Sequence, residues 1–244
     1  MSTLLPLLSK YELFSGSETL KLTPLERQGH CNHHYLLQSD TGCYIIREFG
    51  REARDRALEY HIQSIAYRHG LAPQPLLLDL SHGFMISSYT QGTHIEQLSH
   101  PELKLLAETL KHLHSITIAT LPIVTKSIQT NLDRFSYDPV LCHHDLNPYN
   151  LIWHDRLTLI DWEYAGVNDR YFDLASIIVE FKLSKTQKGS FLDHYFKGES
   201  WSEQKLHAYI RIYKELCTHW WAKRQGGTSK VPSSHDMSLS MPQS

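Results

Sequence analysis

The segment 141–165 constrains this chain more than any other, because a spaced polar motif is followed there by a hairpin signal. The motif is His-x-Asp-x-x-x-x-Asn, formed by His143, Asp145 and Asn150. A second acidic residue, Asp161, follows the hairpin. In phosphoryl transfer, a catalytic-loop Asp accepts the proton of the attacking hydroxyl, while an Asn and a further Asp hold Mg²⁺. The motif therefore predicts a catalytic set in which Asp145 is the proton acceptor.

The residues between Asn150 and Asp161 indicate a short β-hairpin. Two apolar runs, 151–153 and 157–160, flank the polar turn 154–156. Because a hairpin returns the chain to the edge where it started, we expect Asp161 beside Asn150. One amide oxygen and one carboxylate oxygen would then face a single hard cation such as Mg²⁺.

Two other interpretations fit these residues individually. Asp145, Asn150 and Asp161 could each be an ordinary turn or cap residue, but their joint order and spacing favour the catalytic interpretation. His143 and Asp145 could also belong to an iron site with two histidines and one carboxylate. Such a site needs a distant histidine and an all-β scaffold, whereas the following chain has helical patterns.

The composition is typical of an intracellular enzyme. With 244 residues and 41% hydrophobic side chains, the chain can bury a sizeable core in one domain or two lobes. The net charge of −2 gives no general attraction to nucleic acid or to an anionic membrane. The four cysteines lack Cys-x-x-Cys spacing, which indicates reduced thiols and a cytoplasmic location. No apolar run approaches a membrane span, and the N-terminal leucines are too few for a signal peptide.

Histidine is frequent, with 17 residues, and His30, Cys31, His33 and His34 are close together in the sequence. Neighbouring side chains of an extended segment point to opposite faces, so these groups do not readily converge on one tetrahedral ion. We therefore expect no structural zinc site in this segment.

The N-terminal part, residues 1–92, alternates between strand and turn signals. Five strands are expected, at residues 20–25, 33–38, 43–49, 74–80 and 83–89, and one helix at residues 52–69. Alternation along the third strand places Arg47 on one face with apolar neighbours. An isolated arginine in such a position indicates an anionic partner.

The following part, residues 93–224, is expected to be mainly helical. Its helices are expected near residues 99–114, 171–181 and 203–224. Ser99 and Glu102 form a capping-box signal before the first apolar face. The last residues, 225–244, are rich in Gly, Ser and Pro and are expected to be disordered.

Four further stretches complete the pattern: Gly29, Asn32 and Tyr35; Arg47 before Gly50; Glu59 before the turn 70–73; and the block 161–175. Together with the catalytic motif, over about residues 20–224, they resemble the choline/ethanolamine kinase branch of the aminoglycoside-phosphotransferase superfamily. Asn147 stands where protein kinases usually carry Lys, which argues against a protein substrate.

The resemblance implies an α+β, bilobal, protein-kinase-like fold. The N-lobe would be a small five-stranded antiparallel sheet with one helix, and the C-lobe would be mainly helical. ATP and Mg²⁺ would be the cofactors, and a small-molecule alcohol would be the acceptor. The oligomeric state is not predicted.

The resemblance also implies roles for single residues. Gly29 and Asn32 would form the nucleotide loop, while Arg47, held by Glu59, would bind nucleotide phosphate. Asn150 and Asp161 would hold Mg²⁺. His143 would brace the catalytic loop, and Asp173 would brace it too.

The acceptor stays open between several alcohols. Trp220 and Trp221 on a late helix resemble the aromatic wall that binds quaternary ammonium groups through cation–π contacts, and Glu163 could add negative charge. Trp220 also lies on an apolar helical stripe, so core packing explains it equally well. Choline or ethanolamine is favoured, with thiamine and aminoglycosides as alternatives. A kinase-like module that binds nucleotide without catalysis is disfavoured by the intact motif.

Overall fold

The computed structural model describes residues 4–26, 28, 32–52, 54–119 and 132–224. Its contacts divide the chain into two compact units. Unit 1 comprises Met1–Leu98 and Pro148–Ala165, and unit 2 comprises Ser99–Asn147 and Gly166–Ser244. The chain thus passes from unit 2 to unit 1 within the polar motif itself. The lobe limits given above stay a prediction, and the tail 225–244 lies outside the described residues.

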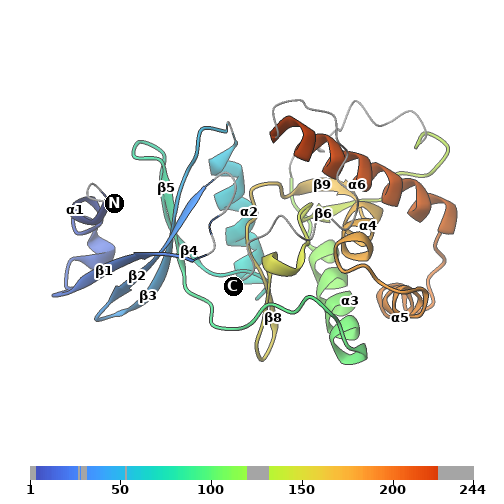
Figure 1. Cartoon of the computed structure of the whole chain (residues 1–244), viewed down its shortest axis with the longest axis horizontal. Coiled ribbons are helices and arrows are strands. Elements are labelled where there is room, and N and C mark those ends of the chain that lie inside the picture. The colour runs from blue at the N-terminus through green and yellow to red at the C-terminus, as the bar shows by residue number, and fades with distance from the viewer. Residues whose placement is uncertain (1–3, 27, 29–31, 53, 120–131, 225–244) are drawn as a thin grey trace. The chain divides into compact units, whose positions relative to one another are not determined.

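Unit 1 is built on a five-stranded antiparallel sheet with the strand order β1-β2-β3-β5-β4 (Figure 1). Its strands are β1 (Leu20–Pro24), β2 (His33–Ser39), β3 (Gly42–Glu48), β4 (Pro75–Asp79) and β5 (Phe84–Ser88). The predicted five-stranded antiparallel sheet is confirmed. The first three strands form a meander, and the β4–β5 hairpin adds to it through β5.

The two faces of this sheet carry different side chains. One face packs its apolar residues Leu37, Ile46 and Ile86 against the N-terminal helix α1 (Leu4–Leu8) and the 3-10 turn η1 (Glu12–Phe14). The other face carries Arg47 and faces α2 (Arg56–Arg68) (Figure 1). The alternation along β3 therefore separates the apolar core from the charged residues.

The helix α2 begins later than predicted. It starts at Arg56 rather than at residue 52, because the Asp55 side chain accepts a hydrogen bond from the Leu58 backbone N–H at 2.9 Å and caps the helix there. It ends at Arg68 with His69 as the C-cap residue, and Gly70 follows with a left-handed backbone, φ +74°.

A second part of unit 1 follows the polar motif. The 3-10 turn η3 (Pro148–Asn150) leads into the hairpin of β7 (Leu151–Trp153) and β8 (Leu157–Leu159). The predicted hairpin is therefore present. Thr93 and Trp153 exchange two backbone hydrogen bonds of 3.0 and 2.9 Å, and the Leu159 N–H donates to the Leu71 carbonyl at 2.8 Å. These bonds hold the hairpin to the earlier segments of unit 1.

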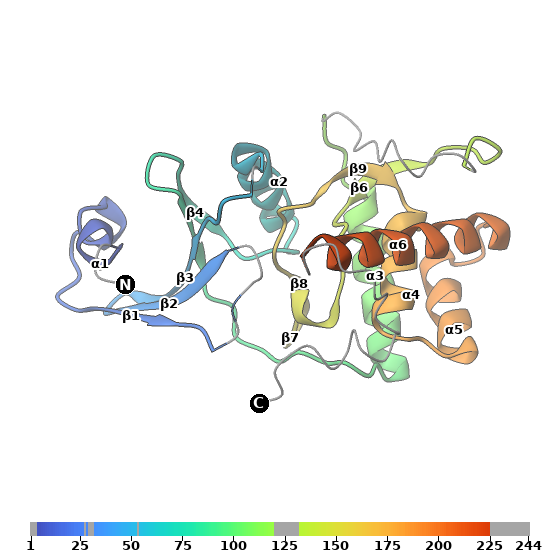
Figure 2. The ribbon, with the colours of Figure 1, turned by 45° about the horizontal axis from the view of Figure 1, so that its top comes forward.

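Unit 2 is mainly helical, as predicted. Its helices are α3 (His100–Ser115), α4 (Tyr171–Glu180), α5 (Lys185–Phe196) and α6 (Glu203–Arg224), and its strands β6 (Pro139–Cys142) and β9 (Gly166–Asp169) pair with each other. The helix α3 packs on α5, and α4 packs on α6 (Figure 2). None of the described helices is both long enough and apolar enough to cross a membrane.

Candidate active site

The hairpin brings Asn150 and Asp161 to its base. Leu151 pairs with Leu159, and the Ile160 N–H donates to the Asn150 carbonyl at 3.0 Å. Asp161 has a left-handed backbone with φ 64°, which turns the chain out of the strand. Its side chain is 27% exposed, so the carboxylate is accessible to an ion. An amide and a carboxylate from neighbouring positions form a donor set that fits Mg²⁺.

The side chain of Arg47 links the end of the hairpin, where Asp161 lies, to the helix α2. One terminal nitrogen donates to Asp161 Oδ1 at 2.7 Å, and the other bonds the Glu59 carboxylate. Burial lowers the pKa of Arg47, while Asp161 and Glu163 act in the opposite direction. Within the described residues the buried Arg47 Nε has no hydrogen-bond partner. The expected Arg47–Glu59 pair is thus present, whereas phosphate binding by Arg47 stays a prediction.

The side chain of Glu163 is buried and hydrogen-bonded to other residues of unit 1. Its Oε2 accepts hydrogen bonds from Asn32 Nδ2 and from Arg56, both at 3.0 Å, and its side chain is only 4% exposed. Burial raises the pKa of Glu163, but the bonds from Asn32 and Arg56 outweigh it and hold that pKa below its usual value. These contacts give the predicted acceptor role of Glu163 no support. Gly29 lies outside the described residues.

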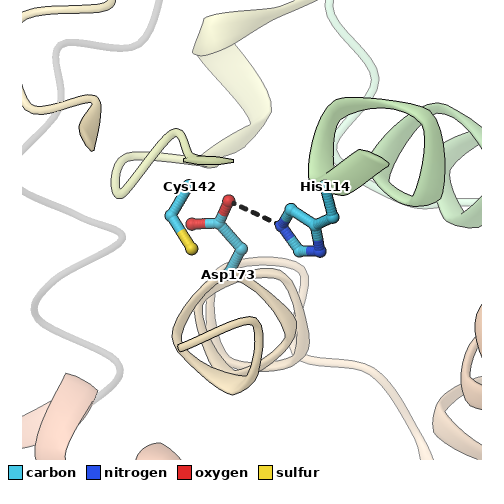
Figure 3. Close-up of side chains that lie close together, drawn as sticks. All are labelled: His114, Cys142 and Asp173. Carbon is cyan, nitrogen blue, oxygen red and sulfur yellow. Dashed lines mark hydrogen bonds and ion pairs between the residues drawn. The ribbon is translucent and has the colours of Figure 1, made fainter. Parts of the chain in front are cut away.

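A buried carboxylate, Asp173, holds the predicted catalytic loop of unit 2. It accepts hydrogen bonds from the backbone N–H groups of His143 at 2.8 Å and His144 at 2.9 Å. His114 Nε2 lies 3.2 Å from Asp173 Oδ2 (Figure 3), and His114 Nδ1 lies 2.6 Å from the Tyr195 hydroxyl. Burial opposes ionisation of Asp173, yet these bonds lower its pKa. Asp173 therefore fixes the backbone on which Asp145 sits.

Asp145 itself is half-buried and surrounded by polar groups of the same loop. Its Oδ1 accepts a hydrogen bond from Asn147 Nδ2 at 3.0 Å, and its backbone N–H lies 3.4 Å from His143 Nδ1. His143 is completely buried. These contacts agree with a bracing role for His143.

Cys142, His114 and Asp173 converge in the interior of unit 2 (Figure 3). Their possible ligand atoms all lie within 4.8 Å of one another. The group does not suit a metal ion. Both oxygens of Asp173 accept backbone hydrogen bonds, and both ring nitrogens of His114 have partners. Burial raises the pKa of the Cys142 thiol well above its usual value, so the thiolate that a metal needs is disfavoured.

The sequence interpretation did not single out Glu180, an acidic residue of unit 2 that bonds to the helix α6. The Tyr213 hydroxyl on α6 donates to Glu180 at the end of α4, at 2.8 Å. Burial raises the pKa of Glu180. Burial, then Glu180, and to a smaller extent Asp145, raise the pKa of Cys217 to about 12. A carboxylate directly after the apolar run 177–179 at the end of α4 was the available signal.

Trp220 and Trp221 lie on the helix α6, after Tyr213. Their rings contact each other edge to face, with centroids 4.9 Å apart, and both side chains are half-buried. Helical spacing places them on the side of α6 that carries Tyr213 and Cys217. Neither tryptophan belongs to the fully buried core.

Known proteins resemble both the sequence and the fold. The model of the phosphotransferase enzyme family matches residues 124–209. A protein named LicA from Haemophilus influenzae is 28% identical over 207 residues, which cover 68% of this chain and 60% of that protein. The crystal structure of choline kinase LicA from Streptococcus pneumoniae has a TM-score of 0.76 at 22% identity, covering 93% of each chain. A structure of LicA in complex with AMP has a TM-score of 0.68 at 24% identity, covering 93% of this chain and 90% of that one.

This chain has the phosphotransferase fold. The resemblance inferred from the sequence is thereby confirmed, together with the protein-kinase-like fold class. Within this phosphotransferase fold, the described site residues fall into two groups. Unit 1 holds Asn32, Arg47, Glu59, Asn150, Asp161 and Glu163, and unit 2 holds His143, Asp145, Trp220 and Trp221.

Proposed function

We propose that the chain is a kinase that uses ATP and Mg²⁺ to phosphorylate a small cationic alcohol of the choline or ethanolamine type. The observation that carries this proposal is the ion pair of Arg47 and Asp161 at the base of the hairpin that also presents Asn150. A cation suited to phosphate is thereby a neighbour of oxygen donors suited to Mg²⁺. The AMP complex and the choline kinase among the similar structures support the same class.

On the nucleotide side, Arg47 would bind the phosphates. Its buried Nε lacks a partner within the described part of the chain, and a phosphate oxygen would satisfy this donor. Asn150 and Asp161 would hold Mg²⁺, which when bound offsets the negative charge of the phosphates.

On the acceptor side, Asp145 would orient the hydroxyl group and accept its proton. The hydrogen bonds from His143 and His144 to Asp173 support this role, because they fix the loop before any substrate arrives. A fixed base avoids the cost of ordering the loop during the reaction.

A cationic acceptor is favoured by groups of α4 and α6 in unit 2, the unit that also holds Asp145. Glu180 supplies a negative charge, and Tyr213 and the two tryptophans on the same side of α6 supply aromatic faces. We propose Glu180, rather than Glu163, as the anionic part of the acceptor site. Trp220 and Trp221 remain candidates for its aromatic part.

The test is a coupled assay of ADP release by the full chain with choline, ethanolamine, thiamine and an aminoglycoside panel, with and without Mg²⁺. We expect turnover that depends on Mg²⁺ and is greatest with choline or ethanolamine. A preference for thiamine or an aminoglycoside would overturn the acceptor assignment and keep the kinase. Nucleotide binding without turnover of any acceptor would identify a non-catalytic module instead.

A further inference from the structure

A second arginine, Arg56, is buried beside the nucleotide residues of unit 1. It occupies the first turn of α2, and its side chain is only 6% exposed. The N-terminus of a helix carries a partial positive charge, so a buried cation is unfavourable there. Arg56 therefore needs specific anionic and polar partners.

Three partners from separate segments surround its guanidinium group. One terminal nitrogen donates to Glu59 Oε2 at 2.8 Å and to Glu163 Oε2 at 3.0 Å, and the other donates to Asn32 Oδ1 at 3.1 Å. Asn32 in turn donates to Glu163, which closes a triangle. The guanidinium also lies over the Phe49 ring, 4.5 Å from its centroid. Arg56 thus joins α2, the end of the nucleotide loop and the segment after Asp161.

The charges of this cluster explain why a second arginine is needed. Arg47 and Arg56 face three carboxylates, Glu59, Asp161 and Glu163. The side chains of Glu59 and Glu163 are 2% and 4% exposed, whereas that of Asp161 is 27% exposed. Arg56 shares Glu59 with Arg47, and among the described residues it forms the ion pair with Glu163. Three carboxylates against two guanidinium groups leave one more negative than positive charge, and Asp161 is the most exposed of the three carboxylates.

We propose that Arg56 is a positioning residue for nucleotide binding. On one side Arg56 holds Glu59, which in turn holds Arg47. On the other side it holds Glu163, which lies two residues after Asp161. Its bond to Asn32 ties the nucleotide loop to the same point. This inference rests on the nucleotide binding of the proposed function but not on its acceptor, because nucleotide binding can be measured without one.

The test replaces Arg56 with Met, which keeps the length and removes the charge. Binding of ATP is measured by calorimetry over a Mg²⁺ series, and thermal unfolding is followed in parallel. Without Arg56, Glu163 is left as a buried, unpaired carboxylate and Arg47 is drawn toward it. We expect Arg56→Met to weaken Mg²⁺-dependent ATP binding about tenfold or more. Arg68→Met is the matched control, because Arg68 lies exposed on the same helix, and it should bind ATP as the unaltered chain does.

A double-variant cycle separates positioning from general stability. Glu163→Gln removes the charge that Arg56→Met leaves unpaired, so the double variant should lose less affinity than the two single losses combined. Arg56→Lys keeps the charge but not the fork that reaches Asn32, and it should retain intermediate affinity. If Arg56→Met does not fold, Arg56→Lys and Glu163→Gln provide the comparison.

Unchanged ATP affinity in folded Arg56 variants would overturn the inference while leaving the kinase proposal intact. A lower melting temperature with unchanged affinity would likewise assign Arg56 a structural role only. If the unaltered chain binds no nucleotide, the proposed function and this inference both fail. ATP binding that needs Arg56, without turnover of any acceptor, would support the inference and contradict the kinase.

Discussion

At the residue scale, the role of Asp145 can be tested with little disturbance of the loop. Asp145→Asn keeps an oxygen that can accept the hydrogen bond from Asn147 and removes the proton acceptor. Because Asp173 holds the loop through backbone groups, the fold should persist. We expect turnover to fall by about 10²-fold or more and nucleotide affinity to stay nearly unchanged, measured by steady-state kinetics and calorimetry.

The control for this change is Asp155→Asn. Asp155 lies in the exposed turn of the β7–β8 hairpin, with a side chain that is 95% exposed, and the substitution changes charge and size in the same way. It should leave turnover unchanged. An Asp145→Asn variant with full activity would remove Asp145 from its assigned role.

Individual residues show which contacts of the site could be predicted from the sequence. The pair of Arg47 and Glu59 could be predicted, because the resemblance to the kinase family implies it. The contacts of Arg56 could not, because its partners Asn32 and Glu163 come from distant segments. Local patterns carry no information about such tertiary pairing, and a helix-start arginine is usually solvent-exposed.

At the element scale, Gly92 follows the five-stranded sheet of unit 1 and lies against the strand β7 of the β7–β8 hairpin. A Cβ atom there would lie 2.5 Å from Ile152 Cγ2 and 2.7 Å from the Trp153 carbonyl oxygen, and φ is +155°. We expect Gly92→Ala to destabilise unit 1 by about 1–3 kcal/mol, measured by chemical denaturation.

Gly189 in α5 is the matched control for this prediction. A Cβ atom at Gly189 meets nothing within 4 Å. Gly189→Ala should therefore stabilise the chain by about 0.5–1 kcal/mol, because alanine is the better helix former. Equal effects of the two substitutions would show that the close contact at Gly92 is relieved at no cost.

Elements were predictable where the pattern is local and strong. The sheet, α3, α4 and α6 follow from alternation, capping and helical spacing. The helix α5 was missed, because its buried residues Phe191, Leu192, Tyr195 and Phe196 all lie in its second half. The capping box of Ser184 and Gln187 was the signal that could have revealed it. The β6–β9 pair was missed because its two short strands are far apart in the sequence.

The side of α6 that carries Tyr213 supplies a test of the acceptor site. Trp221→Leu keeps much of the apolar volume and removes the aromatic face. If Trp221 contacts a cationic acceptor, the KM for that acceptor should rise about five- to thirtyfold with the KM for ATP unchanged, measured by steady-state kinetics.

Trp220→Leu provides the comparison for Trp221, because the two rings contact each other and Trp220 also lies on the apolar stripe. A packing role predicts lower thermal stability and a proportional loss of all activity. If Trp221→Leu leaves the KM of choline, ethanolamine and thiamine unchanged, the aromatic role fails at that residue.

At the scale of the whole molecule, the stability of the fold and the proposed function make opposite demands on Glu180. Burial raises the pKa of Glu180, so its ionised form is disfavoured in the folded chain. A carboxyl group with a raised folded-state pKa contributes stability below its unfolded-state pKa, about 4.3. That contribution is lost as the pH rises through the folded-state value. Above that value the ionised Glu180 weakens the fold, whereas the proposed function needs its charge for a cation.

Glu180→Gln separates the two demands. Glutamine imitates the protonated carboxyl group and can still accept the hydrogen bond from Tyr213. We expect the variant to melt at a higher temperature than the unaltered chain near pH 7, and this difference to vanish as the pH falls toward about 4. The KM for a cationic acceptor should rise at the same time, with ATP affinity unchanged. A variant that gains stability but keeps its acceptor KM would show that Glu180 is buried for another reason, and a pH-independent difference would contradict the raised pKa.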